Sequence, residues 1–98
     1  MPKYTEEDAY AAIEGNKDGD AFEKKYPDCV INIGNLSPKK TETWIGKNPI
    51  SGDIPKIIWY VEYEELDKEK LILFINPNNN KVIGTEVEKL KPAPSEEE

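Results

Sequence analysis

The chain has 98 residues, enough for one small domain with a modest core. Acidic residues number 20 against 13 basic residues, and the formal net charge of −7 disfavours direct binding to nucleic acid or to an anionic membrane surface. The sequence contains no histidine, which removes the commonest general base and zinc ligand, and a single cysteine, Cys29, excludes an internal disulfide.

The first thirty residues predict two short helices. Thr5 precedes three acidic residues, the pattern of an N-cap followed by a negatively charged first turn, and the helix over 8–14 is expected to stop at Gly15. A second helix over 21–26 is predicted to be capped by Asp18 or Asp20.

The pattern changes to a period of two from residue 28 onward, which is typical of strands. The first strand places Cys29 and Ile33 on one face. A short strand is then predicted over 41–45, a loop over 46–55, and three further strands over 56–64, 70–75 and 81–88. The Pro-Asn-Asn-Asn sequence at 77–80 predicts a turn, because Asn tolerates left-handed backbone angles.

Helices followed by a run of strands predict an α+β fold, in which N-terminal helices pack on one face of an antiparallel β-meander of three to five strands. Residues 1–90 are expected to form a single domain, and 91–98 an acidic disordered tail. No apolar run has the length of a membrane span or a signal peptide, so the expectation is a cytoplasmic protein or an excised soluble domain.

Three segments resemble a PepSY-type domain. They are the helix end and strand at 22–33, the aromatic strand Trp-Tyr-Val-Glu-Tyr at 59–63, and the closing hairpin at 73–84. Asn76 stands where the family usually has Asp, Asn79-Asn80 where it has Thr-Gly, and the insert over 41–55 is long for the family. The resemblance implies a helix-on-sheet fold and a regulatory role, such as restraint of a peptidase. It carries over no catalytic residues.

Three features invite a chemical role. The loop 14–20 fits the start of a calcium-binding loop, but Lys25 stands where the bidentate Glu is needed, so a helix stop and cap is the favoured interpretation. Glu62 and Glu64 share a strand face as an acid–base pair would, yet solvated strand residues need the same pattern. Cys29 belongs to an apolar alternation and is expected in the core. We therefore predict no catalytic residues, no metal ligands and no cofactor.

The face of the sheet away from the helices is the predicted binding surface. If the odd-numbered residues of the central strands face the helices, five large apolar residues face the other way, where a solvated sheet face should be mostly polar. These residues are Ile58, Tyr60, Ile72, Phe74 and Val82. The alternative is that the 41–55 insert, with Trp44, folds back and covers this face.

The functional hypothesis is accordingly a non-enzymatic protein-binding or regulatory module that binds a protein partner or a second copy of itself. The alternative is an acidic decoy that occupies a basic, nucleic-acid-binding partner by presenting carboxylates in place of phosphates.

Overall fold

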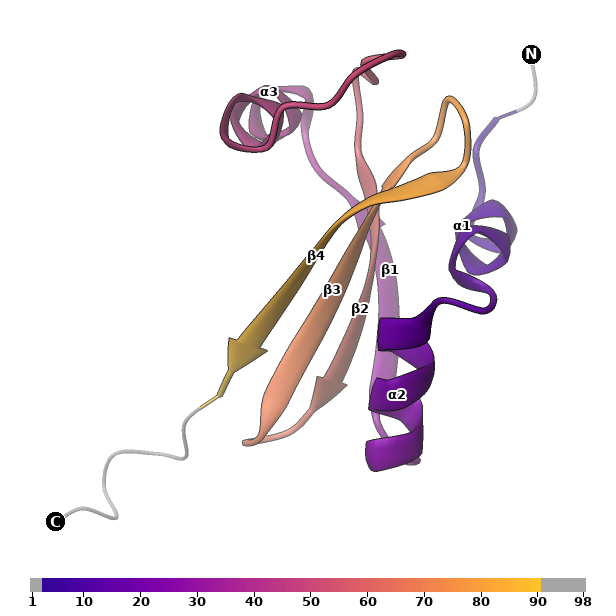
Figure 1. The fold of residues 1–98 in the computed structure, drawn as a ribbon, viewed down its shortest axis with the longest axis vertical. Coiled ribbons are helices and arrows are strands. Elements are labelled where there is room, and N and C mark those ends of the chain that lie inside the picture. The colour runs from indigo at the N-terminus through magenta and orange to yellow at the C-terminus, as the bar shows by residue number, and fades with distance from the viewer. Residues whose placement is uncertain (1–2, 91–98) are drawn as a thin grey trace, which may run out of the picture.

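The computed structural model describes residues 3–90, and the predicted tail over 91–98 lies outside them. Helices α1 and α2 lie on one side of four long strands, and α3 lies at one end on the other side (Figure 1). In chain order the elements are α1 (Glu6–Ile13), α2 (Lys17–Lys25), β1 (Val30–Asn35), α3 (Pro38–Lys47), β2 (Trp59–Glu65), β3 (Glu69–Asn76) and β4 (Lys81–Lys89).

The first helix begins as the sequence predicts. The Thr5 side chain accepts a hydrogen bond from the Asp8 backbone N–H, and the Asp8 carboxylate accepts one from the Thr5 N–H, a reciprocal capping box. Gly15 has φ of +76°, a left-handed angle that glycine adopts without steric cost, and it separates α1 from α2. Ala9 and Ile13 are the buried side chains of α1.

The second helix begins earlier than predicted. Asn16, rather than Asp18 or Asp20, is its N-cap, and the Asn16 side chain accepts from the Gly19 N–H at 3.0 Å. Phe22 is the large buried side chain of α2, and its ring lies 5.9 Å from that of Tyr63 on β2.

The four strands form one antiparallel sheet in the order β1-β2-β3-β4, which confirms the predicted meander. The register is regular except for a bulge between Phe74 and Ile75. There, Phe74 pairs with Gly84 but Ile75 pairs with Val82, so Ile83 is the extra residue on β4.

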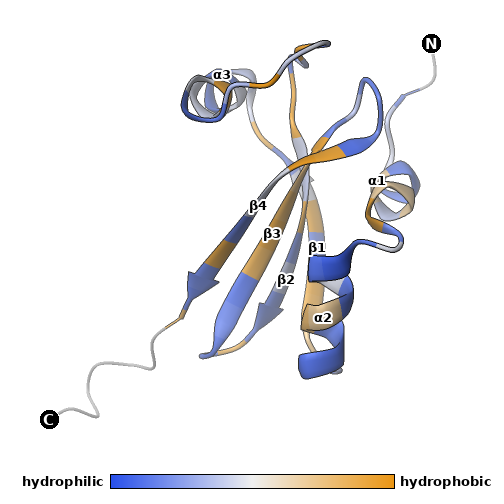
Figure 2. Cartoon of the chain, viewed as in Figure 1, coloured by the Kyte–Doolittle hydropathy of each residue, from blue (hydrophilic) through white to orange (hydrophobic). Residues whose placement is uncertain are grey.

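The main core lies between the sheet and helices α1 and α2. The odd-numbered residues of β2 and β3 supply its sheet side, as the alternation predicts. Hydrophobic residues concentrate along β3, whereas the start of β3 and the end of β4, which lie side by side, are hydrophilic (Figure 2). The buried members are Ala9, Ile13, Phe22, Val61, Tyr63, Leu71, Leu73 and Ile75.

A buried carboxylate ties the end of α2 to the sheet. The side chain of Glu69, at the start of β3, is 9% exposed and accepts a hydrogen bond from the Tyr26 hydroxyl at 2.6 Å. Lys25 and Lys89 approach the same carboxylate at 2.9 and 3.2 Å. The Tyr26 bond first, and then the Lys25 bond, lower the pKa of Glu69 to about 2.

No helix within residues 3–90 is both long enough and apolar enough to cross a bilayer.

Candidate functional site

Residues 38–47 form helix α3, so the prediction of a strand over 41–45 is wrong. The Ser37 side chain caps the helix by accepting from the Lys40 N–H at 3.2 Å, and Pro38 occupies the first turn, where its missing N–H is harmless. The helix ends where Asn48 caps it and Pro49 follows. These end signals outweigh the strand preference of the β-branched residues between them.

Helix α3 is fixed to the sheet face opposite α1 and α2. Thr41 is buried, and its hydroxyl accepts from the Ile58 N–H at 3.0 Å. One turn later, the Trp44 ring packs on Phe74 of β3 with centroids 5.0 Å apart. The 41–55 insert therefore covers part of the predicted binding surface.

The five residues of the predicted binding surface end up in different places. Ile58 and Phe74 are 0% and 5% exposed, and Tyr60 and Ile72 are half-buried. Val82 packs against the core under α1 and α2, so its predicted orientation is wrong. The reason is the bulge at Ile83, since one extra residue reverses which face the preceding side chain occupies.

On the covered half of this face, two glycines flank a pair of aromatic residues. A cross-strand row joins Gly34, Tyr60, Phe74 and Gly84, one residue from each strand. A side chain at Gly34 would meet the Tyr60 hydroxyl at 2.6 Å, and one at Gly84 would meet Trp44 Cζ2 at 2.5 Å. The two outer positions of the row are glycine because the rings of Tyr60 and Trp44 lie over them.

The other half of this face is acidic. Glu62 and Glu64 of β2 share it, as predicted, with Glu86 and Glu88 of β4. Lys70 lies between the two strands, with its Nζ 3.9 Å from a Glu62 oxygen. Glu86 and Glu88 are exposed and the other charged side chains are partly buried, so this half of the face presents charges around the half-buried Ile72.

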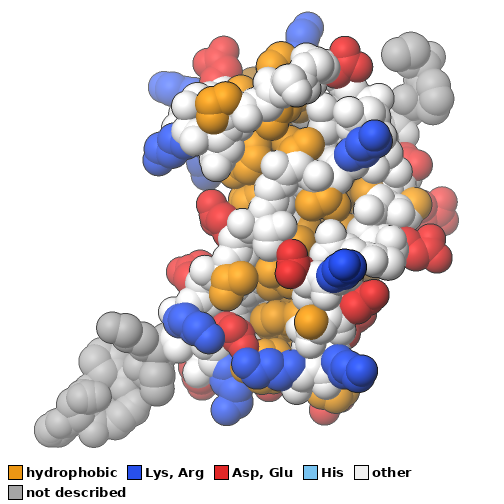
Figure 3. Space-filling view, in the orientation of Figure 1, with side chains coloured by type: hydrophobic (Ala, Val, Ile, Leu, Met, Phe, Trp, Pro, Cys, Tyr) orange, Lys and Arg blue, Asp and Glu red, His pale blue; other side chains and the backbone are white. Residues whose placement is uncertain are grey.

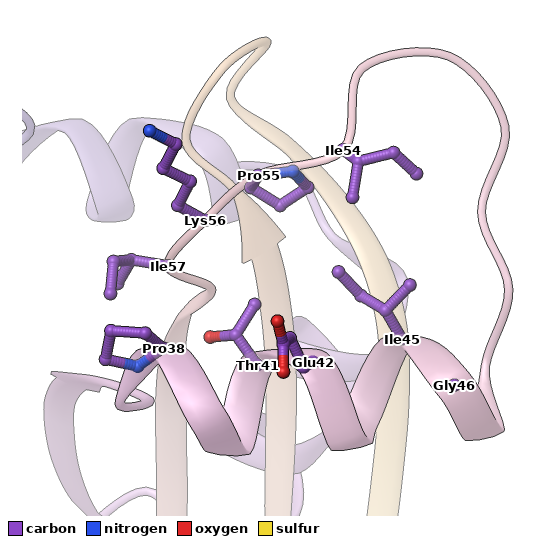
Figure 4. Close-up of a pocket in the computed structure, with 9 residues that line it drawn as sticks. All are labelled: Pro38, Thr41, Glu42, Ile45, Gly46, Ile54, Pro55, Lys56 and Ile57. Atoms are coloured by element: carbon purple, nitrogen blue, oxygen red, sulfur yellow. The ribbon is translucent and has the colours of Figure 1, made fainter.

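The open apolar surface lies instead beside α3. A groove of about 770 Å³ separates α3 from the extended segment 54–57. Ile45 on α3 points toward Ile54 and Pro55 across it, and the Lys56 side chain points away (Figure 4). Ile54 is 54% exposed, a high value for a large apolar side chain in a groove. Figure 3 shows hydrophobic side chains on the surface at the end of the molecule that carries α3, and others along the middle of the molecule.

Sequence reasoning misses this groove because one of its two walls is α3. A strand over 41–45 followed by a loop over 46–55 provides no helix face to carry Ile45. The Ser37-Pro38 cap and the Pro49 stop are the signals that could have revealed it.

The remaining candidates are structural in this geometry. Burial first, and then the charges of Glu23 and Glu65, raise the pKa of the Cys29 thiol, which favours the unreactive protonated form. In the loop 14–20, Asn16 is engaged as the cap of α2. Among residues 3–90, no three His, Cys, Asp or Glu side chains converge as metal ligands would.

Comparison with protein-family models, with curated proteins and with solved structures finds no match for this chain. The resemblance to PepSY domains therefore stays a hypothesis, and function must be argued from the surfaces of the molecule itself.

Proposed function

We propose that this chain is a non-enzymatic protein-binding module whose partner docks on α3, with apolar side chains inserted in the groove between α3 and segment 54–57. One observation carries the proposal: the groove is large, open and lined mainly by apolar side chains, with Ile54 54% exposed. A volume of about 770 Å³ falls within the range of sites that bury a ligand or several side chains of a partner.

The composition of the lining favours binding over catalysis. Glu42 is the one carboxylate in the groove, and Lys56, the one amine, points away from it in Figure 4. Turnover requires a nucleophile or base held against a second polar group, whereas docking requires an apolar recess with a polar rim. If the PepSY resemblance extends to function, the docked partner would be a peptidase or another protein under regulation.

A random-peptide display library tests the proposal while the partner is unidentified. Peptides selected on the full chain should bind it and lose at least about tenfold in affinity on Ile54→Glu, because a charge in the groove forfeits the apolar contact. Leu66→Glu is the matched control: Leu66 is 72% exposed and lies in the β2–β3 turn, at the other end of the sheet. Selected peptides that bind Ile54→Glu as well as the parent would refute the proposal.

A second candidate function is the acidic decoy, which the carboxylate-bearing half of the sheet supports. Glu62, Glu64, Glu86 and Glu88 place charges on β2 and β4, on one face. A decoy of this kind would bind lysine-rich peptides with an affinity that falls steeply as salt is added. Replacing these four residues by Gln would abolish that binding if the decoy hypothesis is correct and leave it unchanged if it is not.

A further inference from the structure

A second groove lies on the other side of α3, against the sheet, and it carries two lysines. Its volume is about 330 Å³. Lys40 and Lys47 both line it and are seven residues apart on α3, or about 10 Å along the helix axis at 1.5 Å per residue. The lining residues are Leu36, Lys40, Thr43, Trp44, Lys47, Asn48, Phe74 and Glu86.

Between these lysines the groove has an aromatic floor with an unused hydrogen-bond donor. The Trp44 ring packs on Phe74, and the Trp44 Nε1 atom is buried with no hydrogen-bond partner among residues 3–90. An indole N–H can only donate, and buried donors are nearly always paired. The floor is therefore apolar, and the indole N–H that lacks an acceptor is buried with the ring.

The charge around α3 opposes that of the rest of the chain. Segment 36–58 contains four lysines and two acidic residues, a formal charge of +2 within a chain of −7. Neither Lys40 nor Lys47 forms an ion pair within the part of the chain that the structure describes. Glu86, on the opposite wall, is the one acidic residue that lines the groove. Two unpaired cations beside an apolar floor are complementary to an anionic ligand that also carries an apolar group.

We propose that this groove binds an acidic peptide segment in which two carboxylates flank an apolar residue. The carboxylates pair with Lys40 and Lys47, and the apolar side chain lies on Trp44 and Phe74. A peptide suits the site better than a phosphate polymer because the floor is apolar and the net charge of the chain repels polyanions. This inference goes beyond the proposed function, because it assigns a ligand of stated chemistry to a second groove of α3.

The test uses a synthetic peptide with a central Glu-Ser-Leu-Ser-Glu sequence and a control peptide with Gln-Ser-Leu-Ser-Gln, because alternate side chains of an extended peptide share one face. The ¹⁵N-labelled full chain has two tryptophans and hence two indole N–H resonances, of which Trp44→Phe identifies one. Adding the acidic peptide should shift the Trp44 indole resonance and leave that of Trp59 in place. The Gln peptide should bind at least about tenfold more weakly, because neutral amides do not form ion pairs with lysine.

Matched charge variants locate the carboxylates. Lys40→Glu with Lys47→Glu should abolish binding of the acidic peptide, and Glu86→Gln should strengthen it by removing a like charge from the groove. Lys17→Glu with Lys24→Glu is the control: it has the same charge change and the same seven-residue spacing on α2, where both lysines are exposed. This control should retain most of the affinity.

Three outcomes would overturn the inference: no binding of the acidic peptide, equal binding of the Gln peptide, or equal losses in the α2 and α3 charge variants. The proposed function is tested separately by Ile54→Glu. Display-selected peptides that need Ile54 but ignore Lys40 and Lys47 would leave the proposed function standing and refute the acidic partner. Acidic peptides whose binding needs Lys40 and Lys47 but is unaffected by Ile54→Glu would support the acidic partner and refute docking in the groove beside Ile54.

Discussion

Replacement of Phe74 by Ala tests whether α3 closes the second face of the sheet. Phe74 is 5% exposed and packs against Trp44 with ring centroids 5.0 Å apart. Truncation of a buried Phe to Ala costs about 3–5 kcal/mol in protein cores. Because the groove carrying Lys40 and Lys47 opens beside Phe74, the site can partly hydrate, and we expect the lower end, about 3 kcal/mol.

Such a loss is a large share of the stability expected for a domain of this size, about 5–15 kcal/mol. With a urea dependence of about 1.5 kcal/mol per molar, the unfolding midpoint should fall by about 2 M at an unchanged slope. The control is Val87→Ala: Val87 is 61% exposed on β4 and should change stability by less than about 0.5 kcal/mol. A loss below about 1 kcal/mol for Phe74→Ala would mean that α3 does not cover this face, and the reasoning would fail.

Two further predictions concern the other end of the sheet and the fit of α3. The folded pKa of Glu69 lies at about 2, below its ordinary value of 4.5, so its contribution to stability is complete above pH 4.5 and is lost as the pH falls toward 2. Glu69→Gln should therefore be less stable than the parent at neutral pH, with a difference in urea midpoint that shrinks across this window; a constant difference would refute the assignment. Gly84→Ala should destabilise by about 1–3 kcal/mol, because its methyl group would lie 2.5 Å from Trp44 Cζ2. Gly46→Ala, with nothing within 4 Å, should stabilise α3 by about 0.5–1 kcal/mol, and thermal melts that rank the two variants in the opposite order would contradict this packing.

The sequence is sufficient wherever the signal is local. The Thr5 N-cap, the helix stop at Gly15 and the strand alternation of β2 and β3 each depend on neighbouring residues, and all three occur in the fold. The turn after β3 likewise follows its asparagines, with Asn80 at φ of +58°. The antiparallel pairing of β2, β3 and β4 follows because consecutive strands joined by short turns pair antiparallel, whereas β1 reaches β2 through the connection that contains α3.

The errors arise where the deciding interaction is not local. Over five residues, Thr41, Thr43 and Ile45 are as compatible with a strand as with a helix, and the caps at Ser37 and Asn48 decide between the two. The bulge that turns Val82 toward the core lies beside Gly84, and a glycine within a strand is compatible with a bulge or with a close approach, without deciding between them. Both grooves depend on how α3 sits beside segments that are distant in the chain, and such packing cannot be inferred from composition or period.

The segregation of positive charge around α3 has a kinetic consequence for any acidic ligand. At low ionic strength, where the Debye length reaches about 30 Å, such a ligand is repelled at a distance by the net charge of −7. Only in close, correctly oriented encounters do the lysines of segment 36–58 dominate. Moderate salt screens the distant repulsion more than the short contacts, so the association rate constant should first rise with ionic strength, the opposite of ordinary electrostatic steering. Approaches from the carboxylate-bearing half of the sheet would be unproductive, and the field of the chain itself would select the direction of arrival.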